Sequence, residues 1–550
     1  MENLTFKCGC KFKLKDRSPS GNNSTPSIDI DISKIDYSCS KTWDIICEGK
    51  TKGVFQLESN LGQSWAKRVK PKSIEELAAL SALLRPGCLK AIVDGKSMTQ
   101  HYVDRKHGEE EISYLHDSLE PILKSTQGVL VYQEQSMKIV EVIAGFNLQE
   151  ADNLRKAIGK KKADLMADIK KKFLKGAKKK GVVSTEIAEE IFSWIEKSNR
   201  YAFNKSHAVS YAVCGYWSAY AKAHFPLNFY CNYLYYARGK PDSQEEIREL
   251  ISDAKLNEIT VTTPSIKHMS ESFEIRDGLI TFGFKDIKYI GESQAKKLFN
   301  SIREQEQVFG KEMSDWTWYE FLINVSGLNT TKVISSLILV GALSFFPDHK
   351  SRSRTLYEFE TWQKLTAKEK DWVKERYKNW DNVLDALKAL NPTKKDGGGT
   401  SNKNRCEIVK DLIYQLKNPP YELKDFPNDI ANEEDRLLGV SITYSKIDSC
   451  DTSMSNGTCK EFIDGKPGKM SLAVEVKSCR EWAIKNGKMK NKKMAFITVE
   501  DNSCELSSVI AFPETWEENK KLLVKGNTVL IIGERSKKKD SFIVQRVSQI

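Results

Sequence analysis

Apolar residues recur at helical spacing over most of the first half of the chain. Between about residues 41 and 270 they lie three or four positions apart, and few stretches alternate as a strand does. Gly181 follows a run of lysines, which is typical of a helix end. One predicted helix before it has an apolar stripe of Met166, Ile169, Phe173 and Ala177. This pattern predicts a mainly α-helical region.

The pattern changes to strand-like alternation near the C-terminus. A helical stretch, 514–523, separates the third predicted strand from the fourth, and this placement indicates an OB-fold barrel. Phe496 and Phe512 could stack on bases, although filling the barrel interior is the favoured role. The five predicted strands are Met470–Ser478, Met494–Glu500, Glu505–Phe512, Thr528–Arg535 and Ser541–Val547. The expected fold is therefore multidomain, mainly α followed by a small β-barrel.

Charge and composition narrow the class of protein. The 550 residues carry a formal net charge of +12, and the segment from Arg155 to Lys180 holds twelve basic residues against two acidic ones. Such a concentration indicates a polyanion site, with a solvated helix face as the simpler interpretation of its lysine runs. No apolar run reaches the ~18 residues of a membrane span, and Met1–Leu4 does not resemble an export signal.

The twelve cysteines lack paired spacings, which indicates reduced thiols in a cytoplasm-like compartment rather than disulfides. Cys8 and Cys10 could join Cys39 and Cys47 in a four-thiolate zinc site. Their spacing fits no standard zinc ribbon or finger, so free thiols are favoured.

Five motifs occur in one order along the helical region. They are Gly53-Val54-Phe55-Gln56-Leu57-Glu58-Ser59, Leu84-Arg85-Pro86-Gly87, Tyr132-Gln133-Glu134-Gln135, Leu154-Arg155-Lys156-Ala157-Ile158-Gly159-Lys160-Lys161, and Tyr201-Ala202-Phe203-Asn204-Lys205-Ser206-His207-Ala208-Val209-Ser210-Tyr211-Ala212. The sequences and the order of these motifs resemble those of the fingers of the bacterial replicative DNA polymerase III alpha subunit, a C-family DNA polymerase. The resemblance covers roughly residues 28–550.

The resemblance implies residues that hold an incoming dNTP or the template. Guanidinium and ammonium groups bind phosphates by charge-assisted hydrogen bonds. For His207, an ordinary packing role is as well supported as a nucleotide contact, while Gln133 and Glu134 are expected to brace neighbouring helices. The expected dNTP or template ligands are Arg85, Arg155, Lys156, Lys160, Lys161, Asn204, Lys205 and His207.

A glycine turn inside Ile287–Leu298 resembles a helix–hairpin–helix element, and the segment Leu328–Leu343 resembles its partner half. Backbone amides in such turns can bind DNA phosphates without reading sequence. Gly291, Lys296 and Lys297 are the expected contacts to the DNA backbone. A plain helical hairpin is the alternative.

The resemblance also organises the chain into parts. They are a polar leader (1–40), a fingers-like helical domain (41–275), a helix–hairpin–helix region (276–390), a flexible linker (391–405), a connecting segment (406–469) and an OB-fold (470–550).

Nucleotidyl transfer needs carboxylates that hold Mg²⁺, and the family carries three palm aspartates for this purpose. Asp29 and Asp31 have the Asp-x-Asp spacing, but Gly53 follows too soon for the family's palm. The favoured interpretation places neither a metal ligand nor a catalytic residue in this chain. Mg²⁺ is expected to be held mainly by a separate palm-bearing chain.

The sequence therefore predicts the fingers and DNA-binding part of a split DNA-directed DNA polymerase. Expected partners are a DNA primer–template, dNTP, the palm-bearing chain and, from the family, a sliding clamp whose binding peptide is not located; no membrane is expected. The expected compartment is the cytoplasm of a bacterial cell or of a bacterial cell infected by a virus. The alternative is a non-catalytic DNA-binding replication accessory derived from a polymerase.

Overall fold

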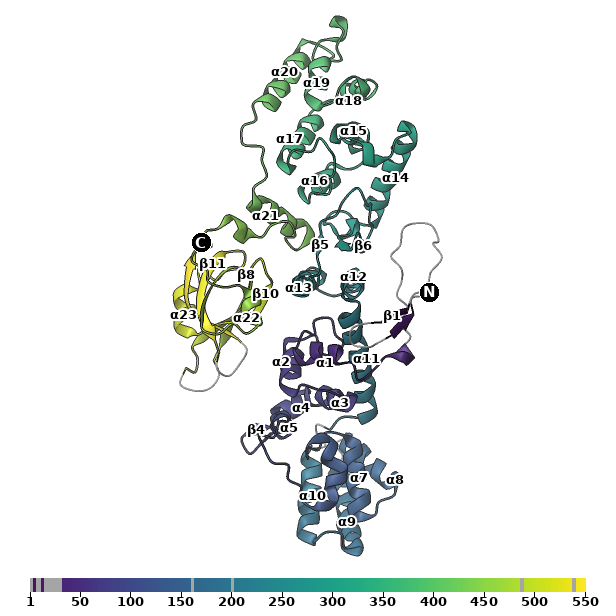
Figure 1. Cartoon of the computed structure of the whole chain (residues 1–550), viewed down its shortest axis with the longest axis vertical. Coiled ribbons are helices and arrows are strands. Elements are labelled where there is room, and N and C mark those ends of the chain that lie inside the picture. The colour runs from purple at the N-terminus through teal and green to yellow at the C-terminus, as the bar shows by residue number, and fades with distance from the viewer. Residues whose placement is uncertain are drawn as a thin grey trace. The chain divides into compact units, whose positions relative to one another are not determined.

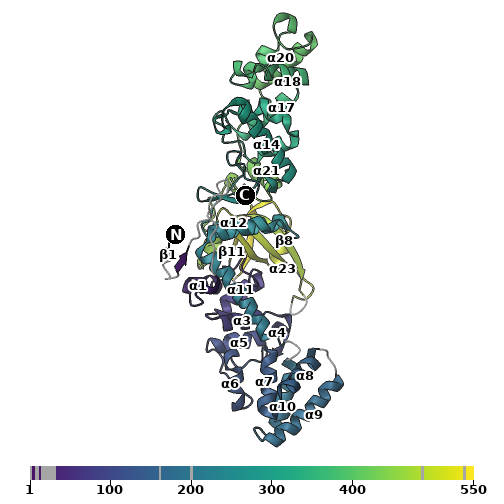
Figure 2. The same ribbon diagram turned by 90° about the vertical axis from the view of Figure 1, so that its right-hand side faces the viewer.

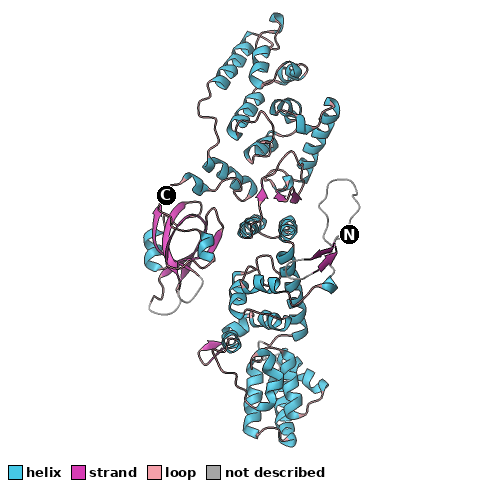
Figure 3. Cartoon of the chain, in the orientation of Figure 1, coloured by secondary structure: helices cyan, strands magenta, loops and turns pink. Residues whose placement is uncertain are grey.

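The computed structural model describes residues 3–5, 11–13, 32–159, 163–198, 202–484, 489–536 and 541–550. Contacts divide the chain into two compact units, Met1–Pro226 and Leu227–Ile550. In the described ranges, no helix combines the length and the apolar character needed to cross a membrane. Most of the chain is helical and the C-terminal part is a β-barrel, so the expected fold class is confirmed (Figure 3).

The first unit is almost entirely helical (Figure 1). Its helices are α1 (Ser40–Cys47), α2 (Asn60–Val69), α3 (Ile74–Leu83), α4 (Pro86–Lys90), α5 (Met98–Lys106), α6 (Glu120–Leu123), α7 (Gln133–Ala144), α8 (Leu148–Gly159), α9 (Ala163–Lys180), α10 (Thr185–Ser198) and α11 (Lys205–His224). Its short strands are β1 (Asn3–Thr5), β2 (Lys11–Lys13), β3 (Ile92–Val93) and β4 (Lys96–Ser97).

Two apolar cores hold this unit together. In the first, α3 packs along α11, and small residues of α11 such as Ala208 and Ala212 let the two helices approach closely. The second core lies inside the bundle of α7, α8, α9 and α10 (Figure 2). On α9 the predicted stripe faces this core, with Phe173 and Ala177 buried, and Gly181 ends the helix at a φ of +68°. The predicted helix is confirmed.

Most of the predicted polar leader, residues 1–40, lies outside the described residues. Its last part is packed: Ile35 and Cys39 are buried, and the carbonyl of Asp36 accepts a hydrogen bond from the Tyr216 hydroxyl at 2.7 Å. The chain from Ile35 onward therefore belongs to the first core, because its apolar side chains fit against α1 and α11.

The second unit begins with helices and ends in the barrel. Its helices are α12 (Pro226–Ala237), α13 (Ser243–Leu256), α14 (Glu292–Phe309), α15 (Trp318–Asn324), α16 (Thr331–Leu339), α17 (Arg352–Gln363), α18 (Ala367–Lys374), α19 (Val383–Leu390), α20 (Lys403–Lys417), α21 (Pro427–Leu438), α22 (Cys459–Ile463) and α23 (Pro513–Asn519). Its strands are β5 (Val261–Thr262), β6 (Glu274–Arg276), β7 (Leu279–Thr281), β8 (Lys469–Ala483), β9 (Lys493–Glu500), β10 (Glu505–Ala511), β11 (Thr528–Arg535) and β12 (Phe542–Gln549).

The segment predicted as a flexible linker, 391–405, is instead a compact turn between α19 and α20. The Thr400 hydroxyl donates to the backbone oxygens of Asn391 and Pro392, both at 3.0 Å. A Cβ on Gly398 would lie only 1.9 Å from the Pro392 oxygen. The glycines are therefore needed for close backbone approach, whereas composition alone suggested flexibility.

The C-terminal strands close into a barrel in the order β10-β12-β11-β8-β9. Only β10 and β12 pair in parallel, and the other neighbours are antiparallel. All five strands match the predicted ones, and α23 joins the third strand to the fourth as expected. Gly533 is required where β11 bends, since a Cβ there would lie 2.1 Å from the Ile543 oxygen. This strand order is that of the predicted OB-fold.

The exposure of Phe496 and Phe512 contradicts one expectation. Core filling was favoured for both, yet they are 42% and 44% exposed. Ile497 and Val499 point into the barrel, so Phe496 points outward by the two-residue period of the strand. The exposed Trp482 lies on the neighbouring strand β8. The barrel thus carries exposed aromatic rings on its outer surface.

Candidate functional site

The N-terminus of α11 is fixed by a short network of polar contacts. The Asn204 side chain caps the helix by accepting the His207 backbone N–H at 2.8 Å. Its amide donates to one oxygen of Glu134 at 2.7 Å, and the Lys205 backbone N–H donates to the other at 2.9 Å. Glu134 therefore ties the first turn of α7 to the first turn of α11, as the expected bracing role requires.

Backbone pairing joins the same two segments. Tyr132 and Phe203 form an isolated parallel bridge, in which the Phe203 N–H donates to the Val131 oxygen at 2.9 Å and the Gln133 N–H donates to the Phe203 oxygen at 3.0 Å. The buried Gln135 side chain secures the turn by accepting the N–H groups of Val131 and Tyr132. Two sequence motifs separated by about 70 residues thus share one backbone frame.

Two predicted phosphate ligands lie on aromatic rings of this frame. The Arg85 guanidinium lies 4.7 Å from the centre of the Phe203 ring, and the Lys205 ammonium lies 5.8 Å from that of Tyr132. In the described part of the chain these ring contacts are the side-chain contacts of the two cations, and neither pairs with a carboxylate. A ring orients a cation but leaves its net charge available, whereas a carboxylate cancels it. Both cations can therefore attract an anionic ligand.

His207 lies among aromatic rings and is exposed. Its ring centre is 3.9 Å from that of Tyr211 and 5.3 Å from that of Phe203, and Tyr211 in turn contacts Phe55 at 5.1 Å. Four of the five sequence motifs, those that contain Phe55, Arg85, Tyr132 and Phe203, are thereby joined by direct contacts. We call this group the α11 site.

A shallow hollow of about 170 Å³ borders the α11 site. This volume is below the ~300 Å³ of a small ligand pocket, so the hollow could hold only part of a nucleotide. The lining residues come from the first two motifs and from α2 and α3: Gln56, Ser59, Leu61, Gly62, Ser81, Leu84 and Arg85.

The fourth motif lies on α8 and differs in its electrostatics. Arg155 and Lys156 both pair with Asp152, at 2.7 Å each. These ion pairs lower the pKa of Asp152 through hydrogen bonds from Lys156 and Arg155. Among the described residues no hydrogen bond, ion pair or ring contact joins Arg155 or Lys156 to the α11 site. Lys160 and Lys161 lie outside the described residues.

The lysine-rich face of α9 is largely exposed, as the simpler interpretation predicts. Lys172 pairs with Glu150 at 2.6 Å, and Lys180 donates to the backbone oxygens of Glu141 and Val142. These contacts hold α9 against its neighbours, while Lys171, Lys175, Lys178 and Lys179 extend into solvent.

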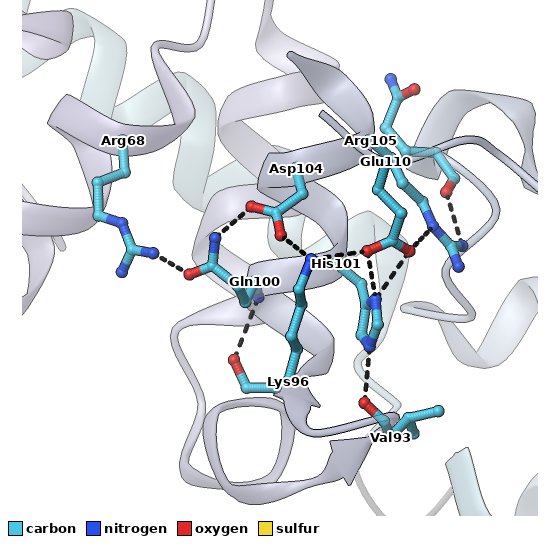
Figure 4. A network of polar contacts seen from close by, with 10 residues as sticks. Arg68, Val93, Lys96, Gln100, His101, Asp104, Arg105 and Glu110 are labelled. Atoms are coloured by element: carbon cyan, nitrogen blue, oxygen red, sulfur yellow. Dashed lines mark hydrogen bonds and ion pairs between the residues drawn. The ribbon is translucent and has the colours of Figure 1, made fainter. Parts of the chain in front are cut away.

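A polar network supports the segment that follows Arg85 (Figure 4). Arg85 is the N-cap of α4, which leads into the β3–β4 hairpin. Glu110 accepts hydrogen bonds from His101 at 2.8 Å and Arg105 at 2.7 Å, while the other His101 nitrogen faces the Val93 oxygen at 2.8 Å. Burial alone would raise the pKa of Glu110, but these donors outweigh it and lower the pKa to about 2.

The same network reaches α2 through a second carboxylate. Lys96 of β4 pairs with Asp104 at 2.6 Å and with Glu110 at 3.3 Å. Gln100 donates to Asp104 and accepts a hydrogen bond from Arg68 of α2. The hairpin is thereby attached to α5 and α2, which limits the movement of α4 and Arg85.

Glu110→Gln is expected to flatten the acid dependence of stability in the first unit. Because the folded-state pKa lies below the ordinary value of 4.5, ionised Glu110 stabilises the fold above about pH 4.5, and this contribution disappears as the pH falls towards 2. Urea unfolding followed by circular dichroism at several pH values between 6 and 2 measures it. The difference between the wild type and the variant should shrink with falling pH. Glu109→Gln, an exposed neighbour, is the control, and an unchanging difference contradicts the assignment.

The predicted hairpin contacts lie at the start of α14. Gly291 is the N-cap of this helix and makes no side-chain cap. Lys296 pairs with Glu292 at 2.6 Å, and both are exposed, as is Lys297. The turn before α14 also holds Tyr289, whose ring lies under the ammonium of Lys332 from α16 at 3.6 Å.

The candidate metal ligands fall elsewhere. Asp29, Asp31, Cys8 and Cys10 lie outside the described residues. Cys39 contacts His224 at 3.3 Å and Cys47 donates to the Pro71 oxygen at 3.3 Å. Within the described ranges no three His, Cys, Asp or Glu side chains gather as a metal-binding group. No described residue is therefore assigned to Mg²⁺, and no chemical step is derived through the ion.

The chain matches two known families. Residues 20–181 match the bacterial DNA polymerase III alpha subunit finger domain, and residues 258–354 match the helix–hairpin–helix motif. The first match contains Arg85, Arg155 and Lys156, and the second contains Gly291, Lys296 and Lys297. The chain thus carries a finger domain of the DNA polymerase III alpha type and a helix–hairpin–helix motif, followed by an OB-type barrel.

The finger-domain match confirms the sequence resemblance to the bacterial DNA polymerase III alpha subunit. The chain is 39% identical to DNA polymerase III subunit alpha of Aquifex aeolicus over 58% of its length, which covers 26% of that protein. It is 29% identical to the subunit of Bacillus subtilis over 94% of its length, and to that of Borreliella burgdorferi over 95%. Each of these two matches covers 42% of the relative.

Sequence reasoning predicted Arg85 and Lys205 as ligands but did not predict the aromatic rings that contact them. Tyr132 and Phe203 stand beside predicted ligands in the motifs, yet their role as ring supports depends on a long-range backbone bridge. The signal that was present is the repeated adjacency of an aromatic residue and a polar or basic group. Lys288 and Tyr289 are a second adjacent pair, but the contact of Tyr289 with Lys332, 43 positions away, is not visible in the sequence.

Proposed function

We propose that this chain is the fingers and DNA-binding part of a C-family replicative DNA polymerase, which binds an incoming dNTP and the primer–template during DNA synthesis. The observation that carries the proposal is the convergence of four motifs at the α11 site. There, Arg85 and Lys205 lie against aromatic rings, and neither pairs with a carboxylate among the described residues. A triphosphate or a template phosphate is the anion that this arrangement suits.

Each predicted ligand that lies within the described residues has a role in this proposal. Arg85 and Lys205 bind phosphates directly. Asn204 and Glu134 keep the first turn of α11 in place, and His207 offers an exposed ring beside Tyr211 for a base or sugar. Arg155 and Lys156 act more weakly, because Asp152 already compensates part of their charge.

The second unit contributes the contacts to DNA. The hairpin at Gly291 binds the backbone of the product duplex through main-chain amides. The barrel guides single-stranded template, with Phe496, Phe512 and Trp482 as exposed surfaces for base stacking. These assignments are supported by the helix–hairpin–helix match and by the aromatic rings on the barrel.

The reaction would also need Mg²⁺, which would stabilise the attacking and leaving oxygens. In this proposal a palm-bearing chain supplies the carboxylates that would hold the ion. A second candidate function is a non-catalytic DNA-binding accessory derived from a polymerase, which the helix–hairpin–helix motif and the exposed aromatic rings of the barrel would serve equally well. Dependence on nucleotide separates the two, since only the polymerase part responds to dNTP.

The purified chain is expected to bind a primed duplex with steep salt dependence but to extend no primer until the palm-bearing chain is added. Fluorescence anisotropy over a salt titration measures binding, and a gel assay of primer extension measures synthesis. Complementary dNTP should tighten the binding of the complete polymerase to primed DNA. Extension by this chain alone, in a preparation free of host polymerase, contradicts the split arrangement. DNA binding that ignores dNTP in the complete assembly supports the accessory function.

A further inference from the structure

Tyr289 adopts a backbone conformation that a bulky side chain rarely takes. Its φ is +74°, in the turn between Ile287 and Gly291. The buried Ile287 and Ile290 fix this turn, and the Lys288 N–H donates to the Leu437 oxygen at 2.8 Å. A glycine would fit the turn without strain. The ring is 42% exposed, so burial in the core does not offset the strain.

What the ring does contact is a set of cations. The Lys332 ammonium lies 3.6 Å from the ring centre, a close cation–π distance, and the Lys288 ammonium lies 5.6 Å away. Arg436 of α21, which pairs with Glu433, also lies near the Tyr289 side chain. An exposed phenol surrounded by basic groups is a surface suited to an anion.

Lys332 differs from the lysine that the sequence singled out. Lys296 pairs with Glu292 at 2.6 Å, so an approaching phosphate has to compete with a carboxylate. Lys332 rests on a ring, keeps its full charge, and has ammonium protons free to donate. It lies in the first turn of α16, whereas Tyr289 precedes α14, so the contact joins the two halves of the hairpin region.

We propose that Tyr289 and Lys332 form an additional phosphate-binding site for duplex DNA, which joins the two hairpins into one binding surface. The inference rests on the proposed DNA-binding function of this region. The ring holds the ammonium in position, and the ammonium binds a backbone phosphate independently of sequence. Tyr289 is thus a positioning residue and Lys332 the direct ligand.

The test measures duplex affinity of the full chain at several salt concentrations. Lys332→Gln should reduce the slope of log affinity against log salt by about 1 and weaken binding about eightfold at 0.1 M salt. Tyr289→Asn, which tolerates a positive φ, should weaken binding in the same direction without lowering the melting temperature. Tyr289→Phe should bind as the wild type does, because the ring remains. Lys388→Gln is the matched control, with less than about a twofold effect expected, because this exposed lysine of α19 pairs with Asp385 at 2.7 Å.

The outcomes separate this inference from the function on which it rests. If the wild-type chain binds no duplex, the proposed DNA-binding function fails. If the wild type binds with steep salt dependence and both Lys332→Gln and Tyr289→Asn match it, the phosphate site is wrong while the function stands. Variants that bind duplex normally but lose a protein partner would likewise overturn the site.

Discussion

Lys205→Ala is expected to lower the efficiency of nucleotide incorporation by the complete polymerase about 100-fold, as the loss of one preorganised charged donor does in other active sites. Lys205 has no carboxylate partner in the described part of the chain, so its charge is available to the incoming phosphates. Single-nucleotide incorporation on a primed template, measured over a range of dNTP concentrations, gives kcat/KM.

Lys138→Ala is the matched control for this measurement. Lys138 is also an exposed lysine of the first unit, on α7, but it pairs with Glu141 at 2.9 Å. The control should leave incorporation unchanged, and Lys205→Ala should leave duplex binding unchanged. Equal kcat/KM values for both variants and the wild type contradict a phosphate-binding role. A loss of duplex binding alone in Lys205→Ala favours the accessory function.

The largest expected effect on stability is that of Glu434→Ala, on α21. Glu434 is fully buried, pairs with Arg352 at 2.8 Å, and accepts the backbone N–H groups of Ile442 and Thr443. Removing the carboxylate leaves the buried guanidinium of Arg352 without its charge partner, which costs about 3–5 kcal/mol in such pairs. Calorimetric melting of the full chain should show the transition of the second unit shifted to lower temperature.

Two further variants make this result specific. The double variant Arg352→Met with Glu434→Leu should recover much of the lost stability, because no uncompensated charge remains. Arg376→Ala, which breaks an exposed pair with Glu375, should change the melting temperature little. If Glu434→Ala melts like Arg376→Ala, the pair does not anchor α17 to α21.

Much of the fold could be predicted from local patterns. The apolar stripe of α9 and the five barrel strands follow directly from the periods of the helix and the strand. The exposure of Phe496 also follows from that period, since its neighbour Ile497 points inward, and the wrong expectation came from residue type alone. The glycines at 397–399 suggested a flexible linker for a similar reason. Composition does not reveal that the Thr400 hydroxyl donates to the Pro392 oxygen.

The candidate site could be predicted only in part. Motif order singled out Arg85 and Lys205 as candidate ligands. The aromatic rings that contact them are brought together by the Tyr132–Phe203 bridge, a long-range contact that no local pattern encodes. Asp152, three residues before Arg155, pairs with it and compensates part of its charge, and the sequence interpretation did not consider this pair. The positive φ of Tyr289 could not be predicted, because tyrosine rarely adopts this conformation and nothing in the sequence indicates it.

The measurement that tests the central claim most directly is a structure of the complete polymerase with primer–template and an incoming dNTP. The account predicts that the Arg85 guanidinium and the Lys205 ammonium lie within about 3 Å of phosphate oxygens of the nucleotide or template, with the metal-binding carboxylates contributed from another chain. Both cations lying more than about 10 Å from the nucleotide and the template strand, beyond the screening length of ordinary salt, would contradict it.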